Sequence, residues 1–316
     1  MPIFRFIVSR LMQTLLVLLG TATVLFVVLY LLVPGDAAQV MLGGRATPQA
    51  LANLRNDLGL NRPLWTQYGL YMWRLLHFDL GTSYELRQSV SSAIIERLPA
   101  TAYLAGAALL LEAIAGIGWG LLMALRRSSR LEAVSAATGA VLLSIPVFFL
   151  GLLLQYFLAG RFHLLPISGL GGWNPLNLIL PATALAGAQA AIVAAVTRAS
   201  LRAEMGKPYI LAARARGLSR RQVMWKHALR NAIGPAATLL AIDLGTLMGG
   251  AMITEVIFSW PGLGRMTYFA VRERDVPLVT GIVLVLVTIF IVINSLIDIV
   301  YGILDPRIRT SESADA

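Results

Sequence analysis

Two acidic residues lie deep inside apolar stretches of the sequence, where isolated charges are rare. Glu112 is near the middle of one such stretch and Asp243 near the middle of another. A carboxylate at the centre of a bilayer costs roughly 2.5–3.5 kcal/mol on insertion scales, so it normally faces protein or water. Such acids could line a path and attract an ammonium group or a cation. They could equally form hydrogen bonds to neighbouring helices, and the sequence leaves both alternatives open.

The basic segment 207–234 is a second region that is rich in charged and polar groups. Its Ala212-Ala213 pair is predicted to offer a smooth face that the backbone of another protein can approach. Glu204 is the only acid close to the surrounding cations, which are Arg214, Arg216, Arg220, Arg221, Lys226 and Arg230. These cations could simply mark the cytoplasmic side of the membrane and contact anionic lipid. The Ala-Ala-x-x-x-Gly spacing favours a protein-docking element instead.

Local signals predict that this segment is folded. Pro208 can occupy the first turn of a helix, where its missing N–H is not needed. Gly217 suits the left-handed position that ends a helix. Ser219 can then cap a second helix, with Gln222 three residues later completing a capping box. The sequence thus predicts a short helix, a tight turn and another helix, stiff enough to transmit force.

The sequence carries no recognisable catalytic or metal-binding constellation. There are no cysteines, and His77, His163 and His227 fall in three different segments. A phosphate-binding Gly-x-x-x-x-Gly-Lys-Ser/Thr loop is also missing, because Gly206-Lys207 lacks that spacing. We therefore expect no catalytic residue, no metal site, no bound cofactor and no ATPase activity in this chain.

The elements that must position these residues are membrane spans. Hydrophobic residues make up 57% of the chain and charged residues 13%. Six apolar stretches are long enough to cross a hydrocarbon core of about 30 Å: 11–33, 99–125, 133–158, 178–197, 233–257 and 279–303. The first is too long for a signal-peptide core and ends in the turn Pro34-Gly35-Asp36. The predicted fold class is an all-α polytopic membrane protein with six transmembrane helices.

The basic residues predict the orientation of these spans. With both termini in the cytoplasm, most of the 26 lysines and arginines fall on the inner side, nine of them between Arg198 and Arg230. The same asymmetry explains the formal net charge of +10, so nucleic acid is not an expected partner. The predicted organisation is a tail and first span at 1–33, an extracytoplasmic segment at 34–98, a five-helix core at 99–303 and a cytoplasmic tail at 304–316.

The extracytoplasmic segment contains aromatic residues at helical spacing, from Leu64-Trp65 to Tyr71-Met72-Trp73. Tryptophan and tyrosine are typical of the membrane boundary, which predicts an interfacial helix. A docking face for an external partner is the alternative.

The order of several motifs resembles one transporter family. The segment Leu211-Ala212-Ala213-Arg214-Ala215-Arg216-Gly217 followed by Asn231-Ala232-Ile233-Gly234-Pro235 is similar to the Glu-Ala-Ala-x-x-x-Gly loop of ABC importer permeases, with Leu211 in place of the glutamate. Other motifs resemble the dipeptide/oligopeptide/nickel branch, first-permease type: Leu58-Gly59-Leu60-Asn61-Arg62-Pro63-Leu64, Asp79-Leu80-Gly81-Thr82-Ser83, Arg97-Leu98-Pro99-Ala100-Thr101, Thr254-Glu255 with Phe258-Ser259-Trp260-Pro261-Gly262-Leu263-Gly264, and Leu304-Asp305-Pro306-Arg307-Ile308-Arg309.

This resemblance implies a type I ABC importer permease in a bacterial cytoplasmic (inner) membrane. The implied partners are a paralogous permease subunit, two cytosolic nucleotide-binding subunits that use ATP and Mg²⁺, an extracytoplasmic substrate-binding protein and the lipid bilayer. The implied ATPase-coupling residues are Leu211, Ala212, Ala213, Arg214, Arg216, Gly217, Leu218 and Ser219. The candidates for the translocation path are Glu112, Asp243 and Glu255.

The cargo implied by the resemblance is a dipeptide or oligopeptide, with nickel, a metal chelate or glutathione as alternatives within the family. A proton-coupled secondary transporter would also use acids at the bilayer midplane, but it needs no capped docking loop and usually shows internal repeats. A membrane-embedded hydrolase would need a nucleophile with its base, which the sequence does not offer.

Overall fold

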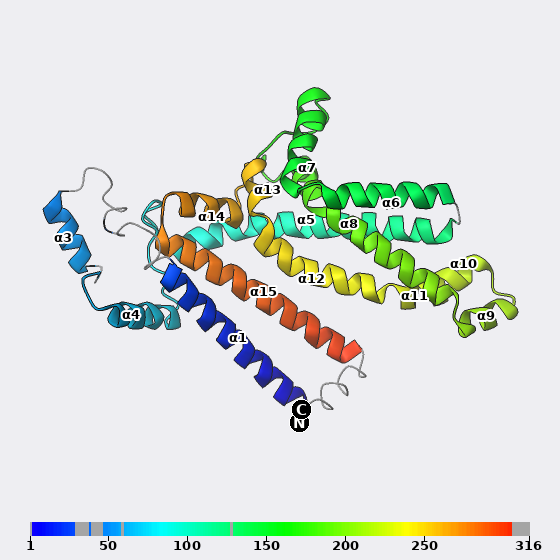
Figure 1. Cartoon of the computed structure of the whole chain (residues 1–316), viewed down its shortest axis with the longest axis horizontal. Coiled ribbons are helices and arrows are strands. Elements are labelled where there is room, and N and C mark those ends of the chain that lie inside the picture. Colours follow the sequence, from blue (N-terminus) through cyan, green and yellow to red (C-terminus); the bar gives the residue numbers. More distant parts are fainter. Residues whose placement is uncertain (1, 29–37, 39–46, 58–59, 127–128, 305–316) are drawn as a thin grey trace. The chain divides into compact units, whose positions relative to one another are not determined.

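The computed structural model describes residues 2–28, 38, 47–57, 60–126 and 129–304. Among these residues the only β pairing is an isolated bridge between Thr82 and Ser89, and almost all other regular structure is helical (Figure 1). The end of the first predicted span, the Pro34-Gly35-Asp36 turn and the tail from residue 305 lie outside the described residues. The predicted all-α class is confirmed.

The described residues form the following helices. In chain order they are α1 (Pro2–Phe26), α3 (Pro48–Asp57), α4 (Leu64–Leu76), α5 (Val90–Leu125), α6 (Ser129–Ser144), α7 (Val147–Leu154), η3 (Gln155–Arg161), α8 (Pro175–Met205), α9 (Pro208–Ala215), α10 (Arg220–Val223), η4 (Met224–Ala228), α11 (Leu229–Ala232), α12 (Gly234–Gly250), α13 (Met252–Ile257), α14 (Leu263–Arg272) and α15 (Val276–Leu304).

Three helices of the described part are long and apolar enough to cross a membrane, namely α5, α8 and α15. Two bent pairs also qualify if each is counted as one span: Ser129–Ser144 with Val147–Arg161, bent by 104°, and Arg221–Ala232 with Gly234–Gly249, bent by 45°. Leu11–Phe26 is a shorter apolar helix. The stretch 133–158, predicted as a continuous span, is therefore broken. The break is at Pro146, which lacks the N–H that a continuous helix would need.

One compact unit consists of Met1–Thr101 and Pro261–Ser295. Its apolar core joins the start of α5 to α14 and the start of α15, with the buried residues Val90, Ala93, Ile94, Leu263, Ala270, Leu278, Val279 and Ile282. The buried Asp275 carboxylate accepts hydrogen bonds from the Ser83 hydroxyl (2.5 Å) and the backbone N–H groups of Glu85 (3.1 Å) and Leu278 (3.2 Å). These contacts fix the loop before α5 against the start of α15.

The second unit consists of Ala102–Trp260 and Leu296–Ala316. Its central helix α8 packs against α6, α7 and α12 (Figure 1). Two glycines of α5 let α8 approach closely: a Cβ on Gly116 would lie 2.7 Å from the Val193 side chain, and one on Gly120 would lie 2.5 Å from the Ala194 carbonyl oxygen. Gly118, between them, has open space around it.

Candidate functional site

The loop between α8 and α12 has the local structure that the sequence predicts. Helix α9 has Pro208 in its first turn, and Gly217 follows it in a left-handed conformation with φ +82°. The Ser219 hydroxyl accepts a hydrogen bond from the Gln222 N–H (3.3 Å), while the Ser219 N–H donates to the Gln222 side chain (3.0 Å). The helix start, the left-handed glycine and the capping box are thus all confirmed.

A small apolar core holds the elements of this loop together. Ile210 and Ala213 from α9 pack with Val223, Ala228 and Ala232, and with Leu201 near the end of α8. Ile210, Val223 and Ala228 are completely buried. The loop therefore has a core of its own, continuous with the end of α8.

A polar cluster also holds the loop together. The Tyr209 hydroxyl donates a short hydrogen bond to the nearly buried Glu204 carboxylate at the end of α8 and accepts one from the Asn231 amide (2.9 Å). The ammonium of Lys207 lies 2.6 Å from the same carboxylate. The three contacts join α8, α9 and α11, which are separate helices. We call Glu204, Lys207, Tyr209 and Asn231 the polar brace.

The protonation states suit this arrangement. The hydrogen bond to Glu204, together with its negative charge, raises the pKa of Lys207 above its usual value. Removal from water, and then the hydrogen bond to Glu204, raises the pKa of Tyr209. At neutral pH Lys207 is therefore cationic and Tyr209 keeps the proton that it donates.

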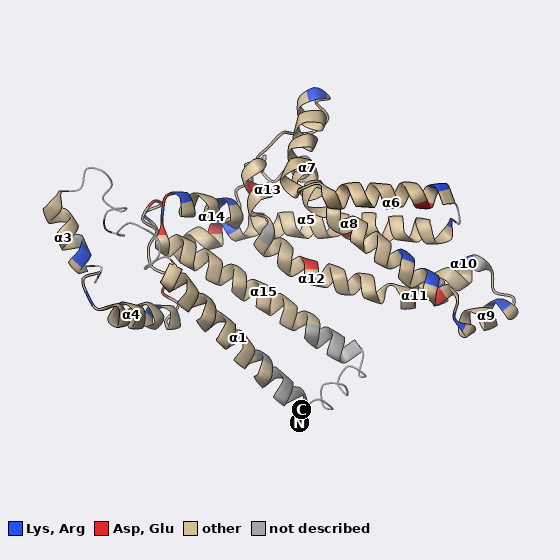
Figure 2. Cartoon of the chain, viewed as in Figure 1, with Lys and Arg blue, Asp and Glu red and all other residues tan. Residues whose placement is uncertain are grey.

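The outer face of the loop is basic with apolar residues between the cations. Leu211 is 58% exposed, and Ala212, Arg214, Arg216, Gly217, Leu218 and Ser219 are exposed as well. Ala213 is the exception among the predicted coupling residues: it is 8% exposed and belongs to the core of the loop. The expectation of a smooth Ala212-Ala213 face is therefore wrong for Ala213, because consecutive helical residues point about 100° apart. Figure 2 marks the lysine and arginine positions of α9 and of the adjacent end of α8 in blue on the ribbon.

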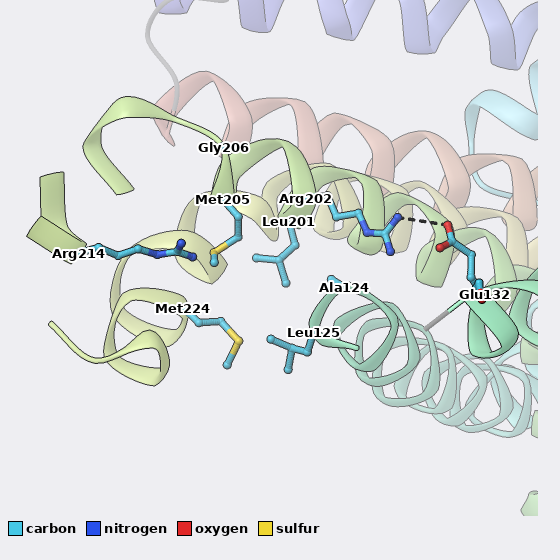
Figure 3. A pocket seen from close by; sticks show the side chains of 10 residues that line it. Ala124, Leu125, Glu132, Leu201, Arg202, Met205, Gly206, Arg214 and Met224 are labelled. Atoms are coloured by element: carbon cyan, nitrogen blue, oxygen red, sulfur yellow. Dashed lines mark hydrogen bonds and ion pairs between the residues drawn. The ribbon is translucent and has the colours of Figure 1, made fainter. Parts of the chain in front are cut away.

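A cleft of about 830 Å³ opens at the base of the loop, with residues of α5, α6, α8, α9 and η4 in its walls. Figure 3 shows Arg214 and Met224 on the loop side, facing Leu125 and Ala124 of α5. Glu132 pairs with Arg202 at 3.2 Å across one edge and also with Arg198. The cleft separates part of the loop from the end of α5.

The two acids that the sequence places in the middle of apolar stretches lie together inside the second unit. Glu112 of α5 is completely buried. Asp243 of α12 is 9% exposed, and its carboxyl group is a neighbour of the Glu112 carboxyl group. Gln189 of α8 donates a hydrogen bond of 2.6 Å to Asp243. Neither Glu112 oxygen has a partner that meets hydrogen-bond geometry among the described residues. The hydrogen bond between Gln189 and Asp243 therefore joins α8 to α12.

Glu255 is placed apart from these acids in the chain, in the short helix α13, and is completely buried. Its backbone carbonyl accepts a 2.7 Å hydrogen bond from the N–H of Trp260, which is also completely buried. Trp260 stacks on Tyr103, with ring centroids 6.3 Å apart. Within the chain, Glu255 thus lies in a helix that is packed against a buried tryptophan.

Sequence reasoning missed three residues of these sites. Gln189 is the only amide in the apolar stretch 178–197, which was the available signal. Glu204 was noted only as a nearby acid, and Tyr209 was not singled out. The brace depends on the fold of the loop, which brings Asn231 back beside Tyr209, 22 positions earlier in the chain.

Family models match most of the chain. Residues 116–310 match the binding-protein-dependent transport system inner membrane component, and residues 3–105 match the N-terminal region of such membrane components. Curated relatives match over nearly their full length. The dipeptide transport system permease protein DppB of Alkalihalophilus pseudofirmus is 37% identical and that of Escherichia coli (strain K12) is 35% identical, covering 95% and 96% of this chain and 98% of each relative. A putative peptide transport system permease protein of Brucella abortus (strain 2308) is 38% identical over 96% of this chain and 98% of its own length.

Solved structures share the fold. An inward-facing form of the MetNI methionine ABC transporter aligns with a TM-score of 0.56 at 19% identity, covering 67% of this chain and 96% of the matched chain. An amino acid ABC transporter crystallised with histidines aligns with a TM-score of 0.52 at 21% identity, covering 66% and 92%. The fold shared with these transporters is consistent with the family to which the two matching models belong. The chain belongs to the family of binding-protein-dependent transport system inner membrane components.

Proposed function

We propose that this chain is a permease subunit of an ABC importer for dipeptides or oligopeptides and forms half of the translocation pathway. The observation that carries this proposal is the similarity to dipeptide permeases over 95–96% of the chain. It is supported by the folded basic loop between α8 and α12, which the resemblance assigns to ATPase coupling.

The proposed assembly contains a paralogous permease, two cytosolic nucleotide-binding subunits and an extracytoplasmic binding protein. In it both termini of this chain are cytoplasmic, and segment 207–234 contacts an ATPase subunit. Leu211, which replaces a glutamate, would meet an apolar part of that partner, and Arg214 and Arg216 would meet its acidic groups. ATP and Mg²⁺ bind to the partner subunits.

The proposed coupling step is a rigid-body movement. Closure of the ATPase dimer displaces α9, and the apolar core and the polar brace carry this displacement to α8 without deforming the loop. Because α8 packs against α6, α7 and α12, its movement repositions the helices of the second unit. The spans then alternate between inward-open and outward-open arrangements by hinge or shear motion.

The pathway role of Glu112, Asp243 and Glu255 stays a separate proposal. All three are buried within this chain, so they would reach the lumen only if the helices around them rearrange during transport. The alternative role for Asp243 is to join α12 to α8 through Gln189.

The proposed function can be tested by reconstituting the complete importer in proteoliposomes with ATP on the cytosolic side. Uptake of a radiolabelled dipeptide, or of an oligopeptide that binds the external partner, should require ATP and survive a protonophore. Uptake driven by a proton gradient without ATP would refute the proposal. Uptake of nickel or glutathione with no peptide uptake would overturn the cargo alone.

A further inference from the structure

The carboxylate of Glu132 joins two helices that are far apart in the sequence. Glu132 lies in the first turn of α6, and its Oε1 atom pairs with the guanidinium groups of both Arg198 and Arg202 of α8. A guanidinium N–H of Arg202 donates a hydrogen bond of 3.2 Å to this oxygen. Because positions 198 and 202 are one helical turn apart, both side chains lie on the same face of α8. We call Glu132, Arg198 and Arg202 the ionic triad.

The rest of the contact between α6 and α8 is apolar and shallow. A Cβ on Gly139 of α6 would lie 3.9 Å from the Ala191 Cβ. A Cβ on Gly187 of α8 would lie 4.0 Å from the Leu142 side chain. No residue of α6 is buried. Apolar contacts alone hold membrane helices together weakly, because lipid chains are as apolar as leucine. In the part of the chain that the structure describes, the ionic triad supplies the polar contact between these two helices.

The ionic triad lies at the end of α8 that continues into the basic loop. Arg202 is in the last turn of α8, next to Leu201, which belongs to the core of the loop. Glu132 and Arg202 lie at one edge of the cleft at the base of the loop, and Arg214 of α9 lines the same cleft (Figure 3). α8 and the loop form one side of this cleft, and the ends of α5 and α6 form the other. The ionic triad therefore links the two sides.

The exposure of the ionic triad indicates what it contributes. The side chains of Glu132, Arg198 and Arg202 are 45%, 23% and 40% exposed. An ion pair at such exposure adds little to folding stability. Its removal should therefore leave the chain folded and change how α6 follows α8. Glu132 also stabilises the N-terminal end of α6 by its charge, but that effect does not need the two arginines.

We propose that Glu132 is a positioning residue for coupling. Its carboxylate holds the start of α6 to the end of α8, so that a displacement of the basic loop moves α6 together with α8. The inference rests on the coupling role proposed above for this loop. It assigns the transfer of movement from α8 to α6 to one carboxylate and its two arginines instead of to apolar packing.

The first test uses the absence of cysteine from the chain. Val134→Cys on α6 and Ala199→Cys on α8, both at exposed positions, are introduced together and spin-labelled in the complete importer, whose partner subunits lack accessible cysteine. The dipolar broadening between the labels is compared in nanodiscs without nucleotide and with a non-hydrolysable ATP analogue. We expect equal broadening in the two states. In Arg198→Gln/Arg202→Gln, which keeps Glu132 in place, the broadening should differ between the states.

A second measurement uses charge reversal in proteoliposomes supplied with ATP. Glu132→Arg places three arginines together, and the peptide taken up per ATP hydrolysed should fall by about two- to fivefold, the size expected for an exposed ionic contact. The triple variant Glu132→Arg/Arg198→Glu/Arg202→Glu restores opposite charges and should recover most of this loss. Arg130→Gln, at an exposed position in the same turn of α6, is the matched control and should behave like the original chain.

Three results would overturn the proposal. An equal loss in Glu132→Arg and in the triple variant would show that Glu132 acts on α6 alone. Broadening that differs between the states in the original chain would show that α6 does not follow α8. Equal broadening in both states of Arg198→Gln/Arg202→Gln would show that the arginines are not needed. If the original chain imports no peptide, the proposed function fails, but the spectra still test the ionic triad because they follow nucleotide binding and need no cargo.

Discussion

The basic loop between α8 and α12 and the acid cluster of the second unit, formed by Glu112, Asp243 and Gln189, are stabilised in opposite ways. The loop exposes basic and apolar residues on its surface and is stabilised from within by a small core and the polar brace. The acid cluster buries polar groups of three helices, and Gln189 supplies a hydrogen bond to Asp243. The proposed coupling element must keep its shape while it is displaced, and its stabilising contacts are local. The acid cluster instead joins helices that are far apart in the sequence. If these helices move against one another during transport, as proposed, contacts of this kind must change.

The largest effect is expected at the left-handed turn of the loop. Gly217→Val forces a β-branched residue into φ +82°, which costs about 1–3 kcal/mol and should reorient α9. We expect ATP-driven uptake in proteoliposomes to fall by about tenfold or more, the factor that corresponds to 1.4 kcal/mol.

The control is Gly217→Asn, because asparagine tolerates left-handed backbone and there is open space around this position. Uptake by this variant should stay close to that of the original chain. Equal uptake by the valine and asparagine variants would show that the turn conformation does not matter for coupling.

A somewhat smaller effect, on stability rather than coupling, is expected where α5 and α8 touch. Gly120→Ala places a Cβ 2.5 Å from the Ala194 carbonyl oxygen, and such overpacking costs about 1–3 kcal/mol. The thermal midpoint of the detergent-purified complex should fall. Gly118→Ala, on the same helix with open space, should leave it unchanged. Equal midpoints for the two variants would contradict the close α5–α8 contact.

The polar brace should respond more mildly. Tyr209→Phe removes the hydroxyl that joins Glu204 to Asn231 and costs about 1–2 kcal/mol of local stability. Hydrogen exchange at the backbone amides of α9 should accelerate and uptake should fall a few-fold. Trp225→Phe, at a half-exposed aromatic of the same loop, is the matched control. Unchanged exchange in Tyr209→Phe would mean that the apolar core alone stabilises the loop.

The smallest effect is expected at Asp243. In Asp243→Asn the remaining side-chain oxygen can still accept the Gln189 hydrogen bond, so a helix-bridging residue tolerates the change. Uptake and thermal midpoint should both stay near those of the original chain, whereas Gln189→Leu should lower the midpoint by leaving Asp243 without this donor. A selective loss of uptake in Asp243→Asn, with the midpoint unchanged, would assign Asp243 to the pathway.

The same contrast explains what the sequence could predict. The loop is encoded by neighbouring residues, so Pro208, Gly217 and the Ser219–Gln222 pair predict its helices and turn without knowledge of the rest of the fold. The break at Pro146 also had a local signal, the proline itself. The prediction of one continuous span over 133–158 relied on the apolar composition of this stretch and did not use that signal. The inward direction of Ala213 depends on which side of α9 packs against the loop core.

The acid cluster is different because its residues are far apart in the chain. Glu112 and Asp243 could be recognised as unusual from their apolar surroundings, but their proximity and the Gln189 hydrogen bond follow from how α5, α8 and α12 pack. The polar brace lies between these extremes, since Glu204 and Tyr209 are close in sequence and Asn231 is not.

The proposed docking of the exposed side of α9 on a cytosolic ATPase subunit can be tested directly by cross-linking. Ala212→Cys and Ala213→Cys differ by one position in a chain that has no other cysteine, yet Ala212 is exposed and Ala213 is 8% exposed. Each variant of the complete importer is treated with a short cysteine-specific photo-cross-linker and then illuminated. We expect a cross-link from position 212 to the ATPase subunit and little or none from position 213. No capture of the ATPase from position 212 in an intact complex would contradict it.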